Sequence, residues 1–146
     1  MSTEEQKAKV RRAIDEAFNK GNLNAMDEIV GSDIVFHQPP MPDVKGLEAY
    51  KGIIANIRKI FSDFRFTIDE FIREGDMWAM RYNVQGTHTG QSARLPIPPT
   101  GKKVAITGMA MIRTENDKSV KEWDYVDMLG LMQQLGVAPP MGPGRK

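Results

Sequence analysis

The chain has 146 residues, a common length for one domain, and its 40% hydrophobic and 27% charged residues are typical of a globular protein. With 20 basic against 19 acidic side chains, the formal net charge is +1, so we expect no nucleic-acid partner. The lack of cysteine excludes a disulfide framework, a thiolate nucleophile and a zinc-thiolate site. We predict a single domain over 1–136 and a flexible tail over 137–146.

Neither a signal sequence nor a membrane span is indicated. The first twelve residues mix acidic and basic side chains without an apolar run, and no later segment approaches the ~18 apolar residues that a span needs. We therefore predict no membrane partner and a cytoplasmic location.

Helical periodicity dominates the first part of the chain. Val10, Ile14 and Phe18 recur at intervals of four and form an apolar stripe, and Gly21 suits the left-handed turn that ends such a helix. A brief strand is expected at 33–37, followed by a proline-rich loop. The predicted helices are 3–19, 23–30, 47–62 and, near the end of the chain, 129–135.

Alternation with a period of two replaces the helical pattern after residue 64. Gly86 and Gly90 indicate a bend that curves the sheet. Because helices come first and strands follow with mostly short connections, the order favours an α+β fold with a mainly antiparallel sheet around an apolar pocket. The predicted strands are 64–72, 77–89, 103–113 and 119–127.

Asp124 in the last strand is the best catalytic candidate. Alternation places Glu122, Asp124 and Val126 on one face of the strand and Trp123 on the other. A carboxylate on the inner face of a curved sheet would have its pKa raised by desolvation and could shuttle protons. The alternative, a solvated outer face for Asp124, is equally compatible with the sequence.

The two histidines and several large side chains are the other site candidates. His37, at the start of the proline-rich loop, is the better pocket candidate of the two. For His88, at a strand end, the sequence is equally compatible with a structural hydrogen bond and with a catalytic role. Aromatic side chains at regular spacing are usually core, but as a set they could line a pocket for a flat apolar ligand. The predicted pocket wall consists of Phe18, Tyr50, Trp78, Trp123, His88, Met109 and Ala110.

Common cofactor and metal motifs are missing from the sequence. It contains no GxSxG elbow, no GxxxxGK[ST] phosphate loop, no GxGxxG after a strand and no HExxH pair. We therefore expect chemistry without cofactor or metal.

A set of short motifs, in their order and spacing, resembles the SnoaL-like polyketide cyclases. This family belongs to the superfamily that also contains nuclear transport factor two, scytalone dehydratase and ketosteroid isomerase. The resemblance extends from the first helix to Gly136. The residues that carry it are Gly86-Thr87-His88-Thr89-Gly90, Pro98-Pro99-Thr100-Gly101-Lys102, Arg113, Trp123, Asp127 and Gln134-Leu135-Gly136.

The resemblance implies a cone of helices and a strongly bent sheet around an apolar cavity, with the outer sheet face often used to form a homodimer. It also implies an intramolecular aldol ring closure in which an aspartate on the last strand, here Asp124, takes and returns the proton. The family's histidine and glutamine partners of that aspartate correspond to Ala110 and Gly108 here, so both polar groups are missing. His37 could substitute from the opposite wall.

Two classes of function follow from these observations. The first is a cofactor-independent lyase or isomerase acting on a hydrophobic carbonyl compound, by polyketide cyclase-like aldol closure or a related proton transfer, with Asp124 as general acid/base and His37 as helper. The second is a domain without catalytic activity that uses the same cavity to bind a small apolar molecule, or that serves as a dimerisation module.

Overall fold

The computed structural model describes residues 2–139, so most of the predicted tail lies outside the described residues. Its helical segments are α1 (Thr3–Ile14), the π-helical turn η1 (Asp15–Asn19), the 3₁₀ segment η2 (Leu23–Glu28), α2 (Leu47–Ile60) and α3 (Met128–Leu135). Its strands are β1 (Val30–His37), β2 (Val44–Lys45), β3 (Arg65–Glu74), β4 (Met77–Thr87), β5 (Lys103–Glu115) and β6 (Lys118–Val126). None of the helices in this part of the chain is long and apolar enough to cross a membrane.

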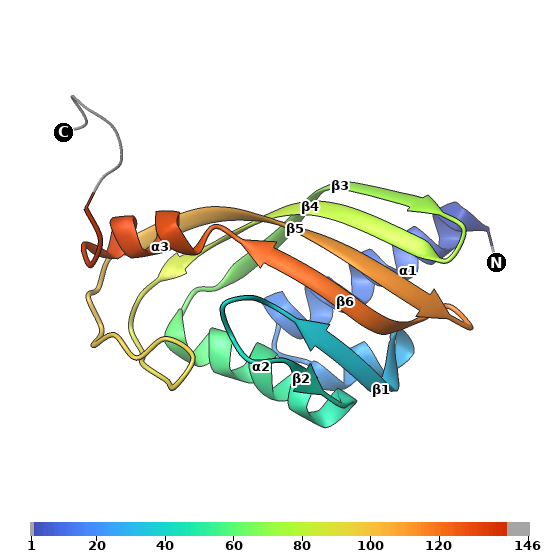
Figure 1. Ribbon diagram of the computed structural model, residues 1–146, viewed down its shortest axis with the longest axis horizontal. Helices are drawn as coiled ribbons and strands as arrows, with labels where there is room; N and C mark the ends of the chain where they lie inside the picture. The colour runs from blue at the N-terminus through green and yellow to red at the C-terminus, as the bar shows by residue number, and fades with distance from the viewer. Residues whose placement is uncertain (1, 140–146) are drawn as a thin grey trace.

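The strands form one six-stranded sheet in the order β2-β1-β6-β5-β4-β3. Figure 1 shows this sheet curving over α1 and α2, while α3 follows β6 at one end. Strands β3 to β6 pair antiparallel in sequence order, and β1 joins the sheet parallel to β6. The α+β prediction is confirmed, and the parallel β1–β6 pair is an addition that sequential pairing did not predict.

The segment around Ile29 differs from its prediction. A helix over 23–30 and a strand over 33–37 were expected, but η2 ends at Glu28 and β1 already begins at Val30. The backbone N–H of Ser119 donates to the carbonyl of Ile29 at 2.8 Å, so β6 draws this segment into the sheet. Tertiary pairing therefore overrides the local helical spacing.

Regular alternation separates the two faces of the sheet. Every second residue of β5 is buried, from Val104 to Thr114, and the intervening side chains are exposed. The larger core cluster lies between this inner face and the helices, and includes Ile14, Ile54 and Trp78. A second cluster joins Leu95 and Ile106 to Leu131 of α3. The inner face of the sheet thus forms one wall of the protein interior.

Candidate active site

A cavity of about 210 Å³ lies between the helices and the inner face of the sheet. Its wall is mostly apolar, and Phe18, Tyr50, Trp78 and Ala110 line it as predicted. For comparison, a cavity of roughly 150 Å³ accommodates benzene in a well-studied protein. The space therefore admits a ligand somewhat larger than a single ring.

Two carboxyl side chains of β6 point into this cavity. Glu122 and Asp124 are each only 8% exposed, and both line the cavity wall. The alternative of a solvated outer face for Asp124 is therefore wrong. Opposite Asp124 on β5 stands Ala110, whose small side chain leaves the carboxyl group facing open space.

Each carboxyl group has hydrogen-bond donors of its own. The Tyr82 hydroxyl donates to Oδ1 of Asp124 at 2.5 Å, and the Gln38 amide donates to its Oδ2 at 3.2 Å. Glu122 accepts a single bond, from the Tyr50 hydroxyl to its Oε1 at 3.3 Å. Because hydrogen bonds to a charged form favour that form, Asp124 is better equipped than Glu122 to carry a negative charge.

Gly108 makes the contact between Tyr82 and Asp124 possible. Tyr82 is paired with Gly108 across the β4–β5 ladder, while Asp124 is paired with Ala110, two residues further along β5. A Cβ atom at Gly108 would lie 2.4 Å from the Tyr82 hydroxyl oxygen, far inside van der Waals contact. Because Gly108 has no side chain, the Tyr82 phenol can pass over β5 at this position and reach Asp124. Tyr82 supplies a donor from β4 where the resemblance implied polar groups on β5.

The electrostatics separate the two carboxyl groups. Burial raises the pKa of Asp124, although its bonds from Tyr82 and Gln38 oppose this. Burial and then the neighbouring charge of Asp124 raise the pKa of Glu122 further above its ordinary value, against one weak bond from Tyr50. Near neutral pH this arrangement favours an ionised Asp124 beside a protonated Glu122.

The two phenols of the site stay protonated as donors. Burial, followed by the nearby carboxylates, raises the pKa of Tyr50 and of Tyr82 above the ordinary tyrosine value. The cavity therefore contains two carboxyl groups with raised pKa values and two neutral hydroxyl groups. Within residues 2–139, no group of three or more acidic, histidine or cysteine side chains is arranged to hold a metal ion.

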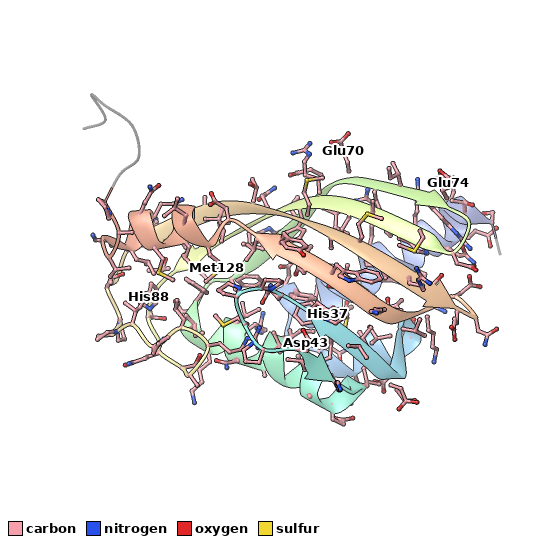
Figure 2. All side chains as sticks on the ribbon, in the orientation of Figure 1. His37, Asp43, Glu70, Glu74, His88 and Met128 are labelled. Carbon is pink, nitrogen blue, oxygen red and sulfur yellow. The ribbon has the colours of Figure 1, made fainter. Side chains whose placement is uncertain are left out.

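Four predicted site residues do not line the cavity, and those predictions are corrected. His37 follows the inward-facing Phe36 on β1, so alternation turns it outward, where it stacks on Trp123 and contacts Asp43 at 2.8 Å. Figure 2 shows His37 beside Asp43, near the segment between β1 and β2. Trp123 is outward because its neighbour Asp124 is inward.

Met109 and His88 are the other two corrections. Met109 alternates with the inward Ala110 and is 60% exposed on the outer face. His88 is fully buried just beyond β4, where its Nδ1 accepts the backbone N–H of Thr100 at 3.2 Å. It holds the base of the β4–β5 connection rather than facing the cavity.

Several polar residues that line the cavity were not among the predicted site residues, and they include Gln38, Tyr82, Arg94 and Glu122. Alternation along β4 and β6 contained a signal for Tyr82 and Glu122, since each shares a face with other inward side chains. Gln38 and Arg94 lie outside the strands and helices, so no periodic signal could have identified them.

Comparisons with known proteins agree with this geometry. The sequence model of the SnoaL-like polyketide cyclase family matches residues 8–135. A comparison with curated protein sequences finds no match.

Solved structures with the same fold include IdmH from Streptomyces antibioticus, provisionally described as a polyketide cyclase. It is 27% identical, with 90% of this chain and 99% of that chain covered and a TM-score of 0.75. AclR from Streptomyces galilaeus, provisionally a hydroxylase, is 25% identical over 97% of this chain and 91% of that chain, with a TM-score of 0.80. A Catenulispora acidiphila protein with a ketosteroid isomerase-like fold is 18% identical, covers 92% and 97%, and has a TM-score of 0.72.

Proposed function

Since the chain belongs to the SnoaL-like polyketide cyclase family, we propose that it is a cofactor-independent enzyme in which Asp124 moves a proton on a hydrophobic carbonyl compound. The reaction class is polyketide cyclase-like aldol ring closure or a related isomerising proton transfer. The observation that carries the proposal is the buried Asp124 carboxyl on the wall of an apolar cavity, held by Tyr82 and Gln38.

The proposed mechanism assigns different roles to the two carboxyl groups. Ionised Asp124 removes a proton from the carbon beside the substrate carbonyl, and the electron pair of that C–H bond becomes an enolate. Protonated Glu122 donates a hydrogen bond to the enolate oxygen, where negative charge develops. In a ring closure, the enolate carbon then forms a bond to a second carbonyl carbon, and the resulting alkoxide regains the proton from Asp124.

Tyr82 and Gln38 act on Asp124 in this scheme. Both donate to its oxygens, so they stabilise the carboxylate that the first step requires. Burial in the mostly apolar cavity acts in the opposite direction and makes the carboxylate more basic. The balance keeps Asp124 ionised near neutral pH while leaving it a competent base.

Hydrogen–deuterium exchange provides a test that needs no knowledge of the natural substrate. The probe is 2-tetralone, a two-ring ketone with acidic protons beside its carbonyl, followed by proton NMR in deuterated buffer. We expect wild type to accelerate exchange and Asp124→Asn to lose about 10²- to 10⁴-fold of that acceleration. Asp127→Asn is the matched control, because Asp127 caps α3 and does not line the cavity. Equal exchange rates for wild type and Asp124→Asn would remove Asp124 from the mechanism.

A binding domain without catalysis is the second candidate. It is favoured by the small apolar side chains Gly108 and Ala110 at positions where the resemblance implies polar groups. Native mass spectrometry after gentle purification separates the two candidates. An unchanged apolar molecule retained by the protein, together with no exchange activity, would favour binding.

We also propose that a second copy of the chain covers the outer sheet face. Met109, Met111 and Tyr125 are 60%, 48% and 59% exposed on adjacent strands there. Arg81 and Glu70 lie on the same face, so a copy related by a twofold axis could pair opposite charges with it. Sedimentation equilibrium should give a dimer for wild type and a monomer for Met111→Glu. A cytoplasmic location stays a prediction from the sequence.

Leu129→Glu is the control for the dimer test, because Leu129 is exposed on α3 rather than on a strand of the sheet. It should leave the dimer intact. A monomeric wild-type protein would contradict the proposal.

A further inference from the structure

Arg94 is a cation on the cavity wall without an acidic partner. Its guanidinium donates to Oε1 of Gln38 at 3.0 Å, and no carboxylate among the described residues forms an ion pair with it. By contrast, Arg81 on β4 is paired with Glu70 at 2.8 Å and with Asp69 at 3.5 Å. An unpaired, half-buried guanidinium beside an apolar cavity is an unusual placement for this side chain.

The loop around Arg94 is built to hold it there. Ser92 and Leu95 exchange two backbone hydrogen bonds, at 3.2 and 3.1 Å, and the Ser92 hydroxyl accepts the Arg94 backbone N–H at 3.2 Å. Leu95, next in sequence, is only 4% exposed and packs in the second core cluster. At the base of the loop, Thr100 is bonded to His88. The turn is therefore anchored on both sides of Arg94.

Arg94 also connects to the reactive carboxyl group through one residue. Because a guanidinium has only donors, it requires the oxygen of the Gln38 amide, which leaves the amide nitrogen to donate to Asp124 at 3.2 Å. One of the five N–H groups of Arg94 is used in this contact, and the other four donate to no atom among residues 2–139. A planar guanidinium matches the two oxygens of a carboxylate.

We propose that Arg94 binds a carboxylate carried by the substrate, so that the substrate class is an apolar carbonyl acid rather than a neutral ketone or ester. This inference rests on the proposed function for the position of the reacting carbonyl. The apolar body of the substrate occupies the cavity, its carbonyl lies at Asp124 and Glu122, and its carboxylate projects toward Arg94. Burial lowers the pKa of Arg94 from its ordinary value, yet arginine remains charged at neutral pH.

Binding of a matched pair of probes tests the inference without any turnover. The probes are 2-naphthoate and its methyl ester, which share the two-ring body and differ in charge, and the measurement is isothermal titration calorimetry. We expect wild type to bind the acid about tenfold more tightly than the ester. Arg94→Met should abolish that preference, and Arg94→Lys, which retains the charge, should keep part of it.

Two variants exclude other sources of the preference. Lys9 also lines the cavity, from α1, so Lys9→Met tests whether the carboxylate binds at the opposite end. Arg81→Met removes an outer-face cation and should leave the preference unchanged. No preference in wild type, a preference that persists in Arg94→Met, or one lost only in Lys9→Met would overturn the inference.

The inference and the proposed function can fail separately. If Arg94 only orients Gln38, Arg94→Met will slow exchange of 2-tetralone without altering the ratio of acid to ester binding, and the inference fails. If Asp124→Asn leaves exchange unchanged while the acid preference depends on Arg94, the proposed reaction fails and the carboxylate site stands.

Discussion

Removing one hydroxyl group, in Tyr82→Phe, should shift the pH dependence of proton transfer upward. The Tyr82 hydroxyl donates to Asp124 at 2.5 Å and thereby opposes the rise in the carboxyl pKa that burial causes. A hydrogen bond to a charged group contributes about 1.5–3 kcal/mol, and about 1.4 kcal/mol corresponds to one pKa unit. The phenylalanine ring fills the buried position of the Tyr82 ring, so only the opposing bond is lost. We therefore expect the pKa of Asp124 to rise by about one to two units.

The assay is the rate of 2-tetralone exchange measured from about pH 5 to about pH 9. In the proposed mechanism, protonation of Asp124 lowers the rate at low pH, and this acid limb should move to higher pH in Tyr82→Phe by the same one to two units. Above the limb the rate should approach that of wild type, because the base is then ionised. Tyr125→Phe is the matched control, since Tyr125 is 59% exposed on the outer face. An acid limb that stays in place or moves to lower pH would refute the assignment of Tyr82.

Three further outcomes follow from the same contacts. Gly108→Ala should move the acid limb in the direction of Tyr82→Phe although the hydroxyl is retained, because the new Cβ displaces the phenol; an unchanged limb would show that the phenol accommodates it. The free energy of unfolding of wild type, measured by urea titration, should fall between about pH 5 and about pH 8. In Glu122→Gln this fall should be smaller by roughly 1–3 kcal/mol. The reason is that folding raises the pKa of Glu122 above 4.5. The stabilisation that Glu122 contributes is therefore complete below that pH and is lost as the pH rises. Asp127→Ala should lower thermal stability by about 1 kcal/mol, since its carboxylate accepts the Gly130 N–H at 2.8 Å, whereas Asp127→Asn should cost less.

The sequence by itself determined which side chains share a face. Alternation along β6 grouped Glu122 with Asp124 and separated both from Trp123, and the structure has the same grouping. The helical stripe of Val10, Ile14 and Phe18 likewise faces the core. These relations are local, because a period of two or 3.6 residues fixes the relative direction of neighbouring side chains.

The placement of His37 was within reach of the same reasoning. Ile34 and Phe36 are the buried members of β1, and alternation from them turns His37 outward. The predicted strand over 33–37 ends at His37, as β1 does, so the sequence already contains this pattern. The prediction of His37 as a pocket residue follows its position beside the proline-rich loop and not this alternation, and it is wrong.

Only the tertiary structure decided which face of β6 is buried and what surrounds Asp124. Periodicity gives two faces and does not say which one packs against the helices. Tyr82 reaches Asp124 from another strand across Gly108, a contact between residues 42 positions apart in sequence. Gln38 and Arg94 come from segments without periodicity and meet because strand pairing and loop anchoring bring them to one end of the cavity. A site assembled from such distant residues depends on the packing of the whole sheet, and no local sequence pattern predicts such a site.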